Sequence, residues 1–279
     1  MGMASYRNGD VHAETESATR ATVEVRGLPL GPTTFALIAG PCSVVASDVT
    51  LRVARDVKTA GATMFRGGAF KPRSEHRSFQ GLGRRALPIL AEARAATGLP
   101  IVTELLDVRD IEAVLEVADL VQVGARNMHN TPLLKALGEV DCPVLLKRGL
   151  AATIDEAVKA ADYIRCGGNE RVVLCERGIR TFETAYRFTL DLAAVPILQD
   201  RSGLPVLVDP SHAAGRRELV PSLSKAAVAV GADGLIVEVD EDPDAALSDG
   251  PQQLRSRDFA AYAAEVRRLA EGEGRQMLE

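Results

Sequence analysis

Eight short apolar runs recur along the 279-residue chain, and this repetition limits its possible folds more than any other feature. Each run is continuous and rich in β-branched residues, which is typical of parallel strands buried on both faces. A strand with one solvent-exposed face would instead alternate apolar and polar residues. The runs occupy residues 35–39, 63–67, 101–105, 119–124, 143–147, 171–176, 205–209 and 234–239.

Helical patterns fill the intervals between these runs. Residues 49–61 and 82–98 each end at a glycine, and Thr153 with Glu156 forms a capping-box pattern at the start of residues 153–168. A strand–helix unit repeated eight times predicts an α/β fold, a single (β/α)8 TIM barrel. A doubly wound open sheet is the alternative, but no GxGxxG follows the first run. Other helices are expected at 108–118, 131–138, 181–195, 217–232 and 258–272.

The N-terminal segment differs from the rest of the chain. Residues 1–20 are polar and aperiodic, which predicts a flexible arm, and residues 21–32 can form a β-hairpin extension. We expect one barrel domain over residues 21–272 and no separate regulatory domain. No apolar run approaches the ~18 residues of a membrane span, and no signal-peptide pattern begins the chain.

Composition narrows the function classes. The net charge is −5, aromatic residues make up 4% of the chain and tryptophan is absent. This balance argues against a nucleic-acid surface built on stacking or phosphate contacts. The four cysteines show no CxxC spacing, which indicates reduced thiols and a cytoplasmic protein.

Cationic residues gather where the apolar runs end, the face on which barrel active sites form. Any one of these residues could instead form an ion pair with a helix carboxylate. Six cations on one rim repel one another unless anions bind there, so we expect a ligand with several phosphate or carboxylate groups. The six residues are Arg66, Lys71, Arg73, Arg126, Lys147 and Arg177.

A second set at the same ends combines a thiol, an imidazole and two carboxylates: Cys42, His212, Glu238 and Asp249. This donor set suits a divalent first-row transition ion acting as a Lewis acid on a carbonyl. Alone, Cys42 could be a small core residue and His212 an ordinary rim residue. Together with the cations, the set indicates carbon–carbon bond formation between phosphorylated metabolites. The residues leave an aldolase and an enolpyruvate condensation both open.

Eight motifs now carry a resemblance, in order: IAGPCSV, FRGGAFKPR, VTELLD, VGARNM, VLLKRG, CERGIRTFE, VDPSHAAGRR and GLIVEVDEDPDAALSDG. Over residues 33–270 the chain resembles the short type Iβ branch of the 3-deoxy-D-arabino-heptulosonate 7-phosphate (DAHP) synthases. That branch is related to the 3-deoxy-octulosonate 8-phosphate (KDO8P) synthases. The resemblance implies a metal-dependent transferase that joins phosphoenolpyruvate to erythrose 4-phosphate, releasing phosphate in the first step of the shikimate pathway.

The resemblance also implies roles for single residues. The metal ligands would be Cys42, His212, Glu238 and Asp249, holding Mn²⁺ or else Fe, Co or Zn. Phosphoenolpyruvate would be held by Arg66, Ala125, Arg126, Lys147 and Arg177. Erythrose 4-phosphate would be held by Lys71, Pro72, Arg73 and Ser74. The residues implied in catalysis are Lys71, Lys147 and Glu104. Lys71, or a water on the metal, would protonate the new hydroxyl group, and Glu104 would orient water. A homo-oligomer, dimer or tetramer, is expected, and a separate regulatory protein stays open.

Two departures from the family pattern leave the fine substrate and metal preference open. Glu75 and His76 stand where Ser and Pro are common, and Asp240 stands where a histidine often follows the metal-binding glutamate. The alternatives are a KDO8P synthase using arabinose 5-phosphate, a non-catalytic binding barrel, and a metal-dependent aldolase. The KPRS sequence at residues 71–74 favours the four-carbon sugar over the five-carbon one.

Overall fold

Eight parallel strands close into a barrel in the computed structural model, which describes residues 20–73 and 75–278. The strand pairing runs in chain order, and β10 pairs with β3 to complete the circle. The TIM-barrel prediction is therefore confirmed, with a strand at each of the eight apolar runs. The strands are β3 (Thr34–Gly40), β4 (Met64–Arg66), β5 (Ile101–Glu104), β6 (Leu120–Val123), β7 (Val144–Lys147), β8 (Val172–Glu176), β9 (Val206–Val208) and β10 (Gly234–Asp240).

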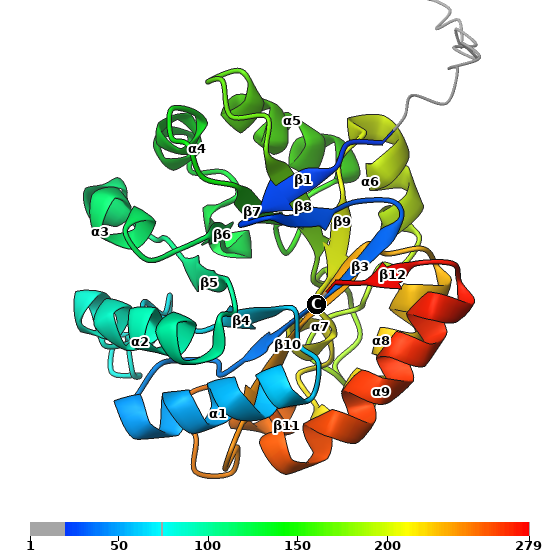
Figure 1. Ribbon diagram of the computed structural model, residues 1–279. Helices are drawn as coiled ribbons and strands as arrows, with labels where there is room; N and C mark the ends of the chain where they lie inside the picture. The colour runs from blue at the N-terminus through cyan, green and yellow to red at the C-terminus, as the bar shows by residue number, and fades with distance from the viewer. Residues whose placement is uncertain (1–19, 74, 279) are drawn as a thin grey trace, which may run out of the picture.

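Helices form a ring around these strands (Figure 1). The predicted capping box is present at α5, where Thr153 and Glu156 each bond the other's backbone. Gly98 ends α2 in the left-handed region, with φ of 74°. The helices are α1 (Ser47–Thr59), α2 (Leu87–Thr97), α3 (Ile111–Leu115), α4 (Thr131–Gly138), α5 (Ile154–Arg165), α6 (Ala194–Ser202), α7 (Pro210–Ala214), α8 (Val220–Ala229) and α9 (Ser256–Gly272).

The helix expected over residues 181–195 is wrong. This segment is a loop, and α6 begins only at Ala194. Ile179 and Thr189 form an antiparallel bridge across the loop, and the hydroxyl groups of Thr181 and Thr189 lie 2.7 Å apart. Contacts of this kind override a weak local helix propensity. The loop therefore stays on the side of the barrel where the strands end.

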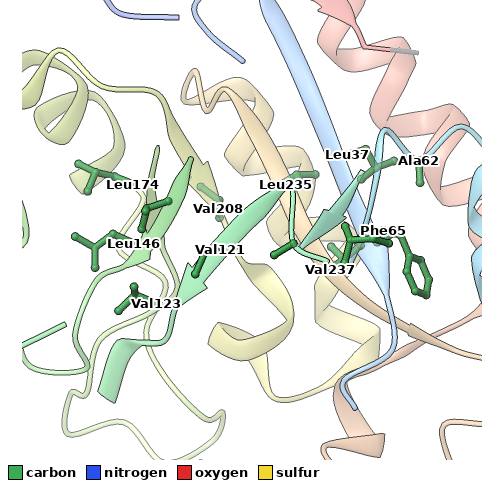
Figure 2. Close-up of a cluster of buried hydrophobic side chains, with 14 of the residues drawn as sticks. Leu37, Ala62, Phe65, Val121, Val123, Leu146, Leu174, Val208, Leu235 and Val237 are labelled. Atoms are coloured by element: carbon green, nitrogen blue, oxygen red, sulfur yellow. The ribbon is translucent and has the colours of Figure 1, made fainter. Parts of the chain in front are cut away.

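Each strand is buried on both faces, as its continuous apolar run predicts. One set of side chains fills the barrel interior, including Ile38, Met64, Leu120 and Ile236. The alternate set packs outward beneath the helices, as Figure 2 shows for Leu37, Phe65, Val121, Val123, Leu146, Leu174, Val208, Leu235 and Val237. No helix in the described part of the chain has the length and hydrophobicity to cross a membrane.

A β-hairpin closes the end of the barrel where the strands begin, as expected for residues 21–32. Strands β1 (Val23–Val25) and β2 (Leu28–Leu30) pair through a turn in which Arg26 and Gly27 have φ of 49° and 83°. Val23, Val25 and Leu30 join the interior core, and the hairpin lies across this end in Figure 1. Near it, β12 (Gln276–Met277) pairs with β3, while β11 (Leu254–Arg255) extends β10. The expected arm of residues 1–20 lies outside the described residues, except for Arg20.

Candidate active site

A polar cavity of ≈ 260 Å³ lies where the barrel strands end. It is lined by many of the residues singled out in the sequence: Lys71, Pro72, Arg73, Glu104, Ala125, Arg126, Lys147, Arg177, His212 and Asp249. Arg66, Cys42 and Glu238 are buried beside it. Ser74 lies outside the described residues. Five lining residues were not predicted: Glu75, Ser78, Gln122, Gly124 and Arg187.

The four candidate metal ligands converge on one wall of this cavity. One ligand atom each from Cys42, Glu238 and Asp249 lies within 4.8 Å of the others. His212 Nε2 is 3.3 Å from Glu238 Oε1 and 4.0 Å from Asp249 Oδ2. Three donors within 4.8 Å of one another, with an imidazole nitrogen next to two of them, suit a divalent cation.

Glu238 supplies a direct test of that fit. Its Oε2 accepts a hydrogen bond of 2.6 Å from Gln252 Nε2. Its Oε1 is buried and has no hydrogen-bond partner among the described residues, although Arg66 Nη1 lies 3.3 Å away. A buried carboxylate oxygen is costly to leave without a partner. A cation among the four donors would supply one, so the residues present fit a metal ion.

Asp209, which the sequence prediction did not assign a role, orients His212. It accepts hydrogen bonds from the backbone nitrogen of His212 at 2.9 Å and from Nδ1 at 2.7 Å, and it also pairs with Lys147. Nε2 is thereby directed toward Glu238. Burial lowers the pKa of His212 to about 4 against the effect of Asp209, so the imidazole is neutral at pH 7 and able to bind a metal.

The Cys42 thiol is protonated in the absence of a metal. Burial, with added repulsion from Glu238, raises its pKa to about 12. The thiol donates to Asp249 Oδ2 at 3.5 Å. A bound cation would replace this proton, because the thiolate is the form that ligates metals.

Asp249 connects the metal wall to the cationic part of the cavity. Its Oδ2 faces the Cys42 thiol, while its Oδ1 lies 3.8 Å from Arg73 Nη1 and 3.7 Å from Arg187 Nη1. The residue has a positive φ of 48°, unusual for a residue other than glycine. The chain is thus held in a strained turn that presents the two oxygens to two different groups.

Two buried arginines carry nitrogens that lack hydrogen-bond partners within the described part of the chain. They are Nε and Nη1 of Arg66 and Nη1 of Arg177. The Phe188 ring lies 4.6 Å below the Arg177 guanidinium and supports its orientation. Arg66 Nη1 still lies 3.3 Å from Glu238 Oε1, but buried donors are normally satisfied, so Nε of Arg66 and Nη1 of Arg177 indicate that an anion binds here.

Glu104 also lines the cavity, and Gln122 Nε2 donates to its Oε2 at 3.1 Å. A side chain at Gly124 would place Cβ only 2.1 Å from Glu104 Oε1, so glycine there leaves room for the carboxylate. Burial raises the pKa of Glu104, although Lys71 and Lys147 act in the opposite direction. Burial therefore favours the protonated form of this carboxyl group.

Comparison with known proteins places these features in context. Residues 24–272 match the profile of the DAHP synthetase I family. The chain is 48% identical to phospho-2-dehydro-3-deoxyheptonate aldolase of Thermotoga maritima over 90% of this chain and 75% of that protein. It is 34% identical to 2-dehydro-3-deoxyphosphooctonate aldolase of Syntrophobacter fumaroxidans over 84% of this chain and 86% of that protein.

Solved structures agree with this sequence similarity. The crystal structure of the T. maritima DAHP synthase superposes with a TM-score of 0.89 at 47% identity, covering 92% of this chain and 76% of that one. A truncated form of the synthase from the same organism gives a TM-score of 0.86 at 44% identity. That superposition covers 92% of this chain and 95% of the truncated one.

Proposed function

Because the chain belongs to the DAHP synthetase I family, we propose that it condenses phosphoenolpyruvate, erythrose 4-phosphate and water to DAHP and phosphate, the first step of the shikimate pathway. The observation that carries the proposal is that the candidate metal ligands lie next to buried arginines, and that both contain atoms without a hydrogen-bond partner. Among the described residues, the candidate metal ligands leave Glu238 Oε1 without a hydrogen-bond partner, and beside them Arg66 and Arg177 hold buried nitrogens that also lack one. Together they suit a carbonyl electrophile and a phosphorylated nucleophile.

Phosphoenolpyruvate takes the deeper position in this proposal. Arg66, Lys147 and Arg177 are all buried, and they offer cationic groups to a phosphate and a carboxylate. The other two proposed contacts, Arg126 and the backbone at Ala125, line the same cavity. Arginine binds such groups with two parallel hydrogen bonds, which orients the enol for attack.

Erythrose 4-phosphate takes the outer position, against Lys71, Pro72 and Arg73, with Ser74 as a further proposed contact. Arg73 is 3.8 Å from the metal-side residue Asp249, so a sugar phosphate bound there has its aldehyde directed toward the four ligands. When bound, a divalent ion supplies Lewis acidity that polarises this aldehyde. Mn²⁺ is the proposed ion, with Fe, Co and Zn as alternatives suited to the same donors.

The chain's own residues then direct the bond changes. C3 of phosphoenolpyruvate attacks the aldehyde carbon, and Lys71 donates a proton to the resulting oxygen. Burial alone would lower the pKa of Lys71, but the negative charges of a Cys42 thiolate and of Glu238 raise it above its usual value, so the amine is protonated. Water oriented by Glu104 adds to C2, and the phosphohemiketal collapses to DAHP and phosphate. Lys147 and the arginines hold both anions within reacting distance.

The second candidate is the KDO8P-type condensation with arabinose 5-phosphate. Relatives 32–35% identical to the chain are named 2-dehydro-3-deoxyphosphooctonate aldolases, and this similarity supports the second candidate. The test measures phosphate release from phosphoenolpyruvate with Mn²⁺, with either sugar, and with or without EDTA. We expect release with the four-carbon sugar and its loss on chelation. Release with arabinose 5-phosphate alone would assign the second function, and no release with either sugar would favour a binding barrel.

We also propose that the protein forms a homo-oligomer, a dimer or a tetramer. Phe182, with 97% of its surface exposed, and Leu247, with 60%, lie on loops that follow β8 and β10. Contiguous exposed apolar patches mark protein–protein interfaces, and in the proposed oligomer these two side chains would form part of such a patch. Light scattering of wild type and of Phe182→Ser tests this proposal. We propose in addition that a separate regulatory protein can bind. Light scattering of the protein mixed with a candidate partner would then show a complex of higher mass.

A further inference from the structure

Arg187 lines the cavity but was not among the predicted site residues. It lies on the loop between β8 and α6, the segment for which a helix was wrongly expected. Backbone bonds hold this part of the loop on α7: Arg187 N donates to Ala214 O at 3.2 Å, and Phe188 N to Ala213 O at 2.9 Å. Gly215 permits the approach, since a Cβ there would lie 2.5 Å from Arg187 Cβ. The position of Arg187 is therefore built into the fold.

Gln252 links Arg187 to the metal wall. Its Oε1 accepts from Arg187 Nη1 at 2.8 Å, and its Nε2 donates to Glu238 Oε2 at 2.6 Å. The Gln252 side chain is only 2% exposed, so both ends of its amide are committed inside the protein. One side chain thus orients a candidate metal ligand and a guanidinium of the cavity together.

Arg187 and Arg73 converge on the same atom from two different loops. Arg187 Nη1 and Arg73 Nη1 lie 3.7 Å and 3.8 Å from Asp249 Oδ1. Among the described residues, the Arg187 side chain donates one hydrogen bond, so most of its five N–H donors remain available. Two guanidinium groups against one carboxylate leave one net positive charge among these three side chains. That charge suits a dianionic phosphate.

We propose that Arg187 binds the phosphate of the aldose substrate together with Arg73, and that Gln252 is the positioning residue that holds Arg187. This inference rests on the proposed function and deepens it. Arg187 and Arg73 set the distance from the sugar phosphate to the metal ligands through their shared contact with Asp249. That distance selects the length of the aldose, so Arg187 determines substrate specificity as well as affinity.

The test compares Arg187→Gln and Arg187→Lys with wild type in steady-state kinetics for each substrate. Loss of a charge-assisted phosphate contact predicts a rise of about 10- to 100-fold in KM for erythrose 4-phosphate with Arg187→Gln. KM for phosphoenolpyruvate and Mn²⁺ affinity, titrated without substrates, should change by less than about 2-fold. Arg187→Lys should recover part of the loss. Arg201→Gln is the matched control, because Arg201 is exposed on α6 and pairs with Asp155.

Gln252→Ala tests the positioning role. It should weaken Mn²⁺ binding as well as raise KM for erythrose 4-phosphate. Adding Arg187→Gln to it should raise that KM by less than the single substitution does in wild type. An unchanged KM in Arg187→Gln, or an equal rise for both substrates, overturns the inference, as does full additivity for the Gln252 role.

Failure of the proposed function has a different signature. If wild type releases phosphate only with arabinose 5-phosphate, the same KM comparison is made with that sugar. If wild type releases none, calorimetric binding of erythrose 4-phosphate to wild type and Arg187→Gln tests the contact directly. Equal affinities would overturn it.

Discussion

Glu104 occupies a space that exists because residue 124 has no side chain. Its carboxyl group is buried against Gly124 and bonded by Gln122 on the neighbouring strand. Burial of this kind disfavours the charged form of the carboxyl group, and the nearby lysines compensate only in part. Burial of the Glu104 carboxyl group, which suits it to its proposed role in catalysis, therefore reduces the stability of the protein without substrate.

Glu104→Gln should therefore stabilise the substrate-free protein at pH 7 while lowering kcat. The folded protein holds the Glu104 proton more tightly than the unfolded chain does. The stability from this group is thus complete below the ordinary glutamate pKa of ~4.3 and is lost as pH rises through the raised pKa. Urea unfolding should give a higher free energy of unfolding for the variant than for wild type at pH 7, and this difference should shrink toward pH 4. A difference equal at both pH values would contradict the buried-charge explanation.

Asp209 gives a second prediction at the level of single residues. Asp209→Asn should lower Mn²⁺ affinity about 10- to 100-fold, because the carboxylate holds the His212 ring with Nε2 toward the other ligands. The measurement is a Mn²⁺ titration followed by electron paramagnetic resonance. Asp119→Asn is the control, since Asp119 pairs with Arg94 and bonds Ile101 N. If both variants bind Mn²⁺ as wild type does, His212 is not positioned by Asp209.

At the scale of elements, the ring of helices depends on close backbone approaches. Helix α4 meets the end of α5 through two glycines: a Cβ on Gly167 would lie 2.7 Å from Gly138 Cα and 2.9 Å from its carbonyl carbon. Backbone atoms cannot rotate away as a side chain can. The two helices would have to separate to accommodate any larger residue.

Gly167→Ala should lower the free energy of unfolding by about 1–3 kcal/mol through this overpacking. Gly272→Ala is the matched control, because Gly272 ends α9 and a Cβ there would meet no described atom within 4 Å. That control should leave stability unchanged or raise it by up to about 1 kcal/mol. Urea denaturation of both variants decides the point, and similar midpoints would show that α4 and α5 can move apart at little cost.

The strands and most helices could be predicted from the sequence because their signals are local. A continuous apolar run needs no partner to be recognised, nor does the capping box at Thr153. The loop at 181–195 could not, because its shape depends on a bridge to Ile179 and on contacts with α7. The helix pattern there was real but weaker than those tertiary contacts.

The site followed the same division. Residues at the end of an apolar run, such as Lys147 and Glu238, could be placed from the barrel topology alone. Asp209 stood in that position too, but its role depends on a bond to His212 that only the structure reveals. Arg187 and Gln252 lie on loops and meet 65 residues apart in sequence, so no spacing rule connects them. Glu176 also ends a strand, yet it pairs with Arg148 away from the cavity.

At the scale of the whole molecule, a bound metal should couple the site to global stability. Its proposed ligands come from β10 and from segments after β3, β9 and β10, so a cation held by them would join distant parts of the chain. Mn²⁺ at 100 times its Kd should raise the free energy of unfolding by about 2.7 kcal/mol over EDTA-treated protein. Thermal denaturation with and without Mn²⁺ measures this. Cys42→Ser and Asp249→Asn should reduce the shift, and an undiminished shift in both would locate the metal elsewhere.

The hairpin of β1 and β2 has a consequence for the order in which ligands bind and leave. In the part of the chain that the structure describes, Val23, Val25 and Leu30 fill that end of the barrel, and the cavity lies at the other end, where the strands finish. Arg66 and Arg177 are buried at the back, while Arg73 and Arg187 stand nearer the threshold, with side chains 23% and 32% exposed. A ligand bound at the deep position would have to bind before a ligand at the outer position, and it could dissociate only after that ligand had left. If the two substrates bind as proposed, this arrangement predicts ordered binding, with phosphoenolpyruvate before erythrose 4-phosphate.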